Sequence, residues 1–145
     1  MRLVIFLFAC AALVCGVGLT LADNQPDISG TWSASSSDKS LPDTLVIALQ
    51  PDSIQLTEKD SGAGKSTDIQ CSTRGQECDI KGEAHARALF YFNGPTLVQT
   101  VYKGKNASEV LKRRYTLQDD GKHLNVEFIP VVPTGPIEKV IYAKK

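Results

Sequence analysis

Residues 110–128 read Val-Leu-Lys-Arg-Arg-Tyr-Thr-Leu-Gln-Asp-Asp-Gly-Lys-His-Leu-Asn-Val-Glu-Phe, with an Asp-Gly turn between two runs that contain apolar residues. After the turn, Leu124, Val126 and Phe128 alternate with polar residues, which is typical of a β-strand with one face in the core and one in water. Asp-Gly between two such runs is a strong signal for a tight hairpin. This segment therefore predicts two antiparallel strands joined by a short turn.

The same pattern recurs along most of the chain, with Pro, Gly, Asn and Asp between the apolar runs. No long stretch has the helical period of about 3.6 residues. Short strands joined by tight turns predict an all-β fold, an antiparallel up-and-down β-barrel of about eight to ten strands, with a β-sandwich as the runner-up. We favour the barrel because an open sheet of that size would leave exposed edges. The expected strands lie near residues 28–35, 45–49, 54–57, 67–70, 78–81, 87–92, 96–103, 110–117, 124–128 and 137–143.

Three short motifs resemble those of small secreted bacterial lipocalin-like (calycin-type) β-barrel proteins, a group of largely unassigned function. Residues 29–32, Ser-Gly-Thr-Trp, resemble the Gly-x-Trp start of the first strand. Residues 115–128 resemble a strand–Asp-Gly-Lys–strand hairpin, and residues 140–142, Val-Ile-Tyr, a Tyr-rich last strand. The resemblance implies a structural role for Trp32 at one barrel end, under a basic side chain for which Lys139 and Lys144 are the candidates. Such a cation–π contact contributes about 0.5–2 kcal/mol.

The first 22 residues have the layout of a secretory signal peptide: Arg2, a long apolar run, and a small-x-small pattern that ends at Ala22. We therefore expect a secreted or periplasmic protein, cleaved near Ala22, with a single domain over residues 23–145. Once removed, the leader leaves no segment for stable membrane insertion. Two alternatives stay open. The run could be kept as a membrane anchor, since about 20 apolar residues span a bilayer, or a lipid could be attached at Cys10 after Ala9.

Cys71 and Cys78 are the two cysteines of the expected mature chain. In an exported protein, two cysteines so close in sequence predict a disulfide, here around a polar hairpin turn at residues 72–77. Their spacing fits neither a redox motif nor a zinc site. His85 and His123 have no further ligand at metal spacing, so we expect no metal site and no cofactor.

Residues 61–67 read Ser-Gly-Ala-Gly-Lys-Ser-Thr and resemble the end of a phosphate-binding P-loop. Lys59 occupies the place of the first glycine, and the polar and β-branched residues that follow do not predict the helix that a P-loop needs. We therefore expect a flexible hairpin loop and no nucleotide. The formal net charge is zero at pH 7 and no basic patch stands out, which argues against a nucleic-acid partner.

Arg113 is the residue with the clearest bearing on ligand binding. It shares one face of its expected strand with two leucines and Tyr115, so it points inward if the leucines do. We predict that the Arg113 guanidinium and the Tyr115 hydroxyl hold the carboxylate of a small amphipathic ligand, since a buried charge needs a partner. The alternative places Arg113 at the rim, in water or paired with Glu127. Phe90 and Tyr102 are candidates for the lining of the same pocket or for the core.

Binding of a small hydrophobic or amphipathic ligand is the leading functional expectation. A protein-interaction module, such as an inhibitor of a secreted hydrolase, is the alternative, with a loop at residues 130–136 or 62–66 as its working surface. A hydrolase is the third possibility, but no pair of nucleophile and base is recognisable and no catalytic residue is predicted. The sequence predicts neither the identity of the ligand nor the oligomeric state.

Overall fold

The computed structural model describes residues 25–35 and 41–145, which form an all-β fold. No helix in these two ranges is long and apolar enough to cross a membrane. The expected leader at residues 1–22, its cleavage site near Ala22 and the alternative lipid site at Cys10 lie outside the described residues. Each described strand overlaps one of the segments predicted above. The strands are β1 (Gly30–Ala34), β2 (Thr44–Gln50), β3 (Ser53–Asp60), β4 (Lys65–Ser72), β5 (Arg74–Asp79), β6 (Ala86–Asn93), β7 (Thr96–Lys103), β8 (Ser108–Leu117), β9 (His123–Pro130) and β10 (Glu138–Lys144).

The strands form one antiparallel, up-and-down β-barrel that is nearly closed, as predicted. Consecutive strands pair from β1 to β4 and again from β5 to β10, and β10 pairs with β1. The sheet order is therefore β4-β3-β2-β1-β10-β9-β8-β7-β6-β5. Because β4 and β5 occupy the two ends of this order, the barrel has a seam between two strands that follow each other in the sequence.

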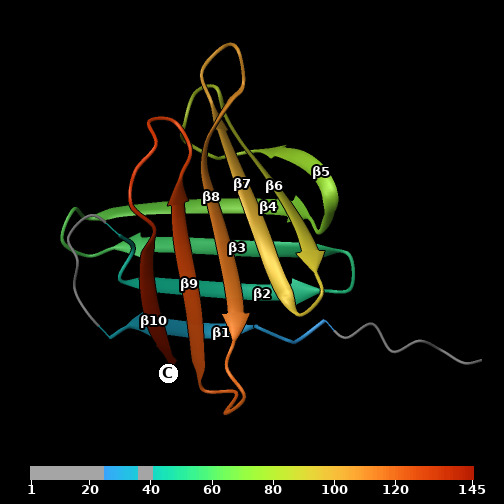
Figure 1. The fold of residues 1–145 in the computed structure, drawn as a ribbon, viewed down its shortest axis with the longest axis vertical. Helices are drawn as coiled ribbons and strands as arrows, with labels where there is room; N and C mark the ends of the chain where they lie inside the picture. Colours follow the sequence, from blue (N-terminus) through green and yellow to red (C-terminus); the bar gives the residue numbers. More distant parts are fainter. Residues whose placement is uncertain (1–24, 36–40) are drawn as a thin grey trace, which may run out of the picture.

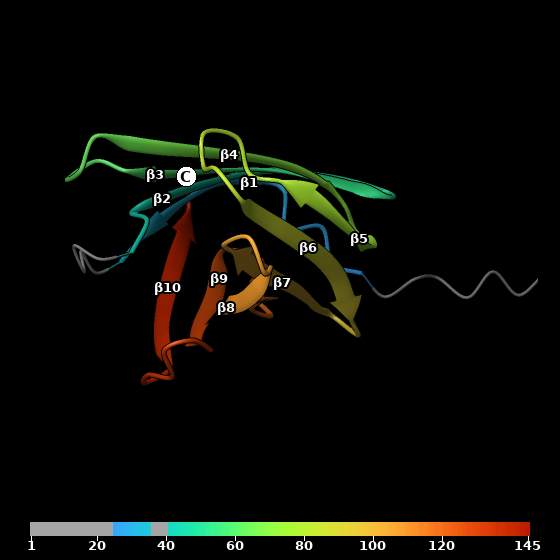
Figure 2. The same ribbon diagram turned by 90° about the horizontal axis from the view of Figure 1, so that it is seen from above.

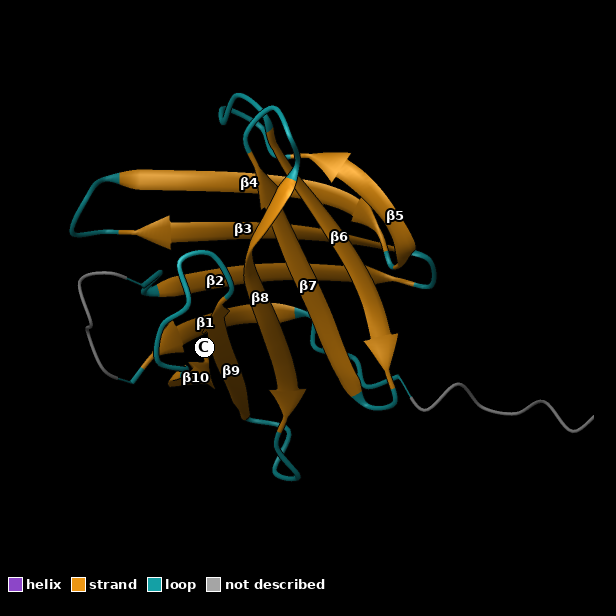
Figure 3. Cartoon of the chain, turned by 45° about the horizontal axis from the view of Figure 1, so that its top comes forward, coloured by secondary structure: helices purple, strands orange, loops and turns teal. Residues whose placement is uncertain are grey.

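The barrel is flattened into two layers whose strands cross steeply (Figure 1). One layer holds β1 to β4 and the other β6 to β10. Seen from above, the layers lie face to face, and β5 lies between β4 and β6 (Figure 2). The described residues outside the strands form turns and loops (Figure 3). The core between the layers includes aromatic side chains that are at most 1% exposed: Trp32, Phe90, Tyr115 and Tyr142.

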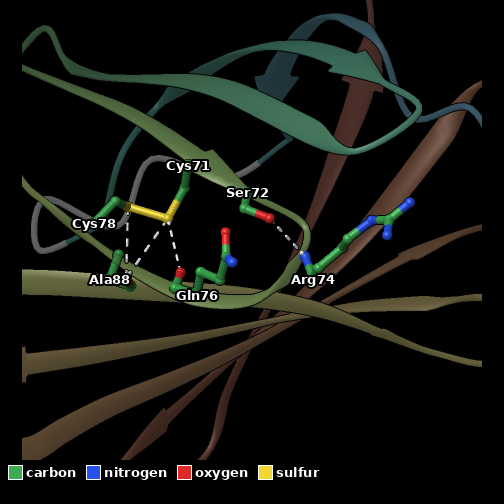
Figure 4. Close-up of a disulfide and its surroundings, with 6 residues drawn as sticks. All are labelled: Cys71, Ser72, Arg74, Gln76, Cys78 and Ala88. Atoms are coloured by element: carbon green, nitrogen blue, oxygen red, sulfur yellow. Dashed lines mark hydrogen bonds between the residues drawn. A yellow bond between two sulfur atoms is a disulfide. The ribbon is translucent and has the colours of Figure 1, made fainter.

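A disulfide closes the seam between β4 and β5. The sulfur atoms of Cys71 and Cys78 are bonded and their Cα atoms lie 5.5 Å apart, which confirms the predicted pairing (Figure 4). Both sulfur atoms contact the carbonyl oxygen of Ala88 on β6, at 3.6 and 3.5 Å. The disulfide therefore fastens the edge of β4 to the neighbouring pair of β5 and β6.

The prediction that residues 72–77 form a hairpin turn is wrong for most of these residues. β5 already begins at Arg74, and its residues pair with β6. Most side chains of β5 are exposed to solvent because the strand lies at the edge of the sheet. Its polar composition therefore reflects that exposure rather than a turn. The chain reverses around Thr73, whose N–H donates to the carbonyl of Asp52 at 3.0 Å.

Trp32 lies on β1 with its side chain fully buried, and its indole Nε1 donates to the carbonyl of Ile28 at 3.0 Å. Of the two lysines predicted to cover the ring, Lys144 does so, with its Nζ 5.3 Å from the ring centroid. Trp32 and Lys144 are direct partners in the β1–β10 register, which places both side chains on one face of the sheet. Lys139 lies elsewhere, with its Nζ 3.1 Å from Glu127 Oε1.

Candidate functional site

A cavity of about 320 Å³ lies at one end of the barrel interior. It is bordered by residues of β3, β4, β7 and β8 and by the loops that follow β5 and β9. It therefore reaches across the seam, from Ile69 on β4 to Ile80 just beyond β5. The apolar part of the wall consists of Ile69, Ile80, Val101, Val110, Leu111 and Val132.

A β-bulge shapes the wall on β8. The register between β7 and β8 is regular up to the pair Val101 and Leu111, and it shifts at Tyr102, which pairs with Glu109. The extra residue, Val110, has no direct partner on β7. Neighbouring residues normally point to opposite faces, but here Val110 and Leu111 both line the cavity.

Arg113 points into the barrel because the alternation of β8 continues without a shift from Leu111 to Tyr115. Its Nη1 donates a hydrogen bond to Glu58 Oε1 on β3, across the interior. The Arg113 and Glu58 side chains are only 12% and 11% exposed. The alternative pairing of Arg113 with Glu127 is wrong. Glu127 pairs in register with Arg114, the next residue along β8, which lies on the opposite face of the strand.

The guanidinium of Arg113 is held charged inside the barrel. Burial by itself lowers the pKa of Arg113, but the negative charge of Glu58 and the oxygen of Tyr115 outweigh it and raise the pKa. The Arg113 Cζ atom also lies 5.1 Å from the ring centroid of Phe128, its direct partner on β9. Burial raises the pKa of Tyr115, which keeps its hydroxyl neutral and able to donate.

Gln99 on β7 connects Tyr115 to Arg113. Its side chain is 0% exposed, and its Oε1 accepts hydrogen bonds from the Tyr115 hydroxyl at 2.7 Å and from Arg113 Nη1 at 3.4 Å. Arg113 can only donate, so the amide of Gln99 must turn its oxygen toward Arg113 and its nitrogen away. The orientation of this amide is thus fixed by the guanidinium.

Two buried donors in the cavity wall have no hydrogen-bond partner within the part of the chain that the structure describes: Gln99 Nε2 and Arg113 Nε. Buried polar atoms without a partner are uncommon, because leaving one unsatisfied costs about 1–3 kcal/mol. Both atoms belong to residues of the cavity wall but are closed to solvent, so an acceptor in the cavity reaches them only if neighbouring side chains shift.

A second cavity of about 310 Å³ shares Glu58, Thr67, Glu83, Lys103 and Arg113 with the first and is more polar. Glu83, in the loop between β5 and β6, lies 3.1 Å from Lys103 Nζ and 3.3 Å from Lys65 Nζ. The hydrogen bond from Lys103 is the main cause that lowers the pKa of Glu83, against the opposing effect of burial. Both lysine side chains are more than half exposed, so this charged cluster forms the water-facing side of the site.

Lys65 belongs to the stretch that resembles the end of a P-loop. Residues 61–64 form the turn of the β3–β4 hairpin, and Lys65 begins strand β4 rather than a helix. This confirms the prediction of a hairpin loop. Lys65 instead takes part in the cluster around Glu83.

The four residues predicted to bind a ligand lie in different places. Arg113 lines the cavity, and Tyr115 lies behind it, connected through Gln99. Phe90 is 0% exposed in the core, and Tyr102 is half-buried on β7; neither belongs to the wall of this cavity. Tyr102 follows the inward-facing Val101, so its side chain lies on the outer face of the strand.

Sequence reasoning missed Glu58 and Gln99. The alternation of inward-facing and outward-facing residues contained a signal for both. Glu58 continues the inward series of Ile54 and Leu56 on β3, and Gln99 sits between Leu97 and Val101 on β7. A polar residue that falls in phase with core residues marks a buried polar site.

The site combines one buried ion pair, one amide and one phenol with an apolar wall. Within residues 25–35 and 41–145, no group of three or more His, Cys, Asp or Glu side chains is placed to hold a metal ion. Comparison with known proteins gives no assignment, because no family model and no curated protein matches the chain.

Proposed function

We propose that this chain is a lipocalin-like binding protein that holds one small amphipathic ligand in the barrel cavity. The observation that carries the proposal is the combination of an apolar wall with two buried donors, Gln99 Nε2 and Arg113 Nε, that lack partners among the described residues. Ligand pockets commonly combine apolar walls with a few polar groups that orient the ligand. The apolar part of the ligand would lie against Ile69, Val101 and Leu111, with its polar end at Arg113.

The dimensions of the cavity favour a small ligand. Its volume of about 320 Å³ lies at the lower end of the range of about 300–1,000 Å³ that is usual for ligand pockets. Large side chains fill the core elsewhere, including Phe90 and Trp32, which are both 0% exposed. We therefore infer one short-chain or single-ring molecule rather than a long lipid.

The proposal includes export to the periplasm or the extracellular space, with removal of residues 1–22. The Cys71–Cys78 disulfide supports it, because disulfides persist in oxidising compartments and are rare in the cytosol. Intact mass spectrometry of the protein from its own source tests this point. We expect the mass of residues 23–145 with the disulfide formed; a mass that includes residues 1–22 contradicts cleavage near Ala22.

Native mass spectrometry of the protein purified from its own source tests ligand binding, because a retained ligand adds its own mass. Leu111→Trp places a large ring in the cavity and should abolish retention. Ile141→Trp adds the same ring at an exposed position of β10, where the side chain is 45% exposed, and should retain the ligand as the wild type does. Equal retention by both variants, with circular dichroism showing both folded, contradicts the cavity as the binding site.

A further inference from the structure

The donors in the cavity wall are oriented before a ligand enters. Arg113 Nη1 and the Tyr115 hydroxyl both occupy Oε1 of Gln99, at 3.4 and 2.7 Å. This leaves Nε2 as the free end of the Gln99 amide. Rotation of the amide would place its nitrogen against the guanidinium, where two donors would face each other. The two unpartnered atoms in the residues of the cavity wall are therefore donors, and a ligand that gains access to them must supply the acceptor.

The positive charge in the cavity is already neutralised. The charged residues of the wall are two acids and two bases, and each base lies against one of the acids, while Glu83 also contacts Lys65 outside this wall. Arg113 pairs with Glu58, and Lys103 Nζ lies 3.1 Å from Glu83 Oε2. Glu58 is only 11% exposed, so water screens its charge poorly. An incoming carboxylate at Arg113 would add a second negative charge beside Glu58, because the excess cation of the Lys65–Lys103–Glu83 cluster lies on the water-facing side of the site.

We propose that the site selects an uncharged ligand whose polar end is a hydrogen-bond acceptor, such as the carbonyl of a ketone, ester or amide, in place of the carboxylate that the sequence predicts. The carbonyl oxygen would accept from Gln99 Nε2 and Arg113 Nε, and the Arg113–Glu58 pair would stay intact. This inference rests on the proposed function, because it specifies the ligand of the same cavity. A neutral acceptor satisfies both donors without bringing a new charge into a site of low polarity.

Nuclear magnetic resonance of the ¹⁵N-labelled protein tests the inference directly, since it observes the Gln99 side-chain amide and the Arg113 Nε–H. The probes are octan-2-one and octanoate, which have the same number of carbon atoms; octanoate is ionised at neutral pH. We expect octan-2-one to shift both donor signals at a concentration about tenfold or more below the one that octanoate needs. Octanoate that shifts these signals at an equal or lower concentration overturns the inference.

Removing the charge of Glu58 should reverse this selectivity. In Glu58→Gln the Arg113 guanidinium loses its counter-charge, so octanoate should bind more tightly than octan-2-one. Glu127→Gln is the matched control, because Glu127 pairs with Arg114 and Lys139 away from the cavity and should leave the wild-type preference unchanged. If Glu58→Gln fails to fold, the wild-type comparison of the two probes still decides the matter.

The outcomes separate this inference from the proposed function. If octan-2-one shifts the backbone signals of Val101 and Leu111 but not the two donor signals, the cavity binds ligands and only the inference fails. If neither probe shifts any residue of the cavity wall, and the purified protein retains no ligand, the proposed function fails as well.

Discussion

Glu58 on β3 and Arg113 on β8 form an ion pair across the barrel interior, although 55 residues separate them in the sequence. Each belongs to a different layer of the flattened barrel (Figure 1). The two side chains are 11% and 12% exposed, so each neutralises a charge that would otherwise be nearly buried and unpaired. The pair thus joins the two layers and also balances the charges of the candidate binding site.

Breaking this pair should destabilise the fold strongly. Glu58→Leu leaves Arg113 charged and unpaired, and we expect a loss of about 3 kcal/mol in the free energy of unfolding. The double variant Glu58→Leu/Arg113→Met should recover most of that loss, because it removes both charges. Urea denaturation measures the differences. Glu127→Gln, which disrupts only partly exposed pairs, should cost less than about 1 kcal/mol. A double variant no more stable than the single one contradicts the explanation by unpaired charge.

Removal of the disulfide should loosen the seam. The bond closes a loop with a sequence separation of seven residues, for which the chain-entropy estimate gives about 2.5 kcal/mol. We expect Cys71→Ala/Cys78→Ala to lower the free energy of unfolding by about that amount. Hydrogen exchange should accelerate most in β4 and β5, which lie at the two ends of the sheet order. The β8–β9 hairpin is the internal reference, and equal acceleration there argues against a local role at the seam.

Gly30 should not tolerate a side chain. Its φ is +139°, and an added Cβ would lie 2.8 Å from Cε of Lys144, the lysine that covers Trp32. We expect Gly30→Ala to cost about 1–3 kcal/mol in urea denaturation and to alter the fluorescence of Trp32 as Lys144 is displaced. Gly62→Ala is the control, because its nearest atom is the Asp60 Oδ1 at 3.4 Å and its φ lies outside the positive range. A Gly30→Ala protein as stable as Gly62→Ala would falsify this account.

The stability of the barrel should fall in alkali. Burial raises the pKa of Tyr115 and of Tyr142 above the ordinary value of 10.0. Above about pH 10 the unfolded chain loses these protons while the folded chain keeps them. The free energy of unfolding therefore decreases as pH rises, by up to about 1.4 kcal/mol per pH unit for each tyrosine. Below about pH 10 the two tyrosines make their full contribution to the free energy of unfolding.

Tyr142→Phe offers the check on this pH dependence. The variant loses the hydrogen bond from the Tyr142 hydroxyl to the Pro42 carbonyl at 2.6 Å, which should cost about 1 kcal/mol at neutral pH. Its stability should nevertheless decrease less steeply between pH 10 and pH 11 than that of the wild type. Urea denaturation across this range measures both slopes, and parallel slopes contradict a raised pKa of Tyr142.

Much of the fold follows from local sequence. Alternation and turn residues predict most of the described strands, and residues 96–103 coincide with β7 in full. The β8–β9 hairpin follows from Asp120-Gly121, where Gly121 has a φ of +65° that suits glycine. β5 is the exception. Its exposed, polar side chains have no alternation, because a solvent-exposed edge strand does not need an apolar face.

Less of the candidate site than of the fold could be predicted from the sequence. Alternation predicts that Arg113 points inward if Leu111 and Leu117 do, and it leaves a position at the rim as the alternative. Alternation cannot identify the partner of Arg113, because Glu58, which neutralises its charge, belongs to the opposite layer and is not a neighbour in the sheet. Glu127 is the closer candidate in sequence, but it lies on the other face of β9.

The sequence by itself predicted most of the strands and turns and the pairing of Cys71 with Cys78, because each of these depends on residues close together in the chain. Only the tertiary structure decided that β4 and β5 meet at a seam, that Glu58 neutralises Arg113, and that Gln99 turns its Nε2 away from the guanidinium. These features depend on how two layers cross, and side-chain alternation within a strand carries no information about the layer opposite.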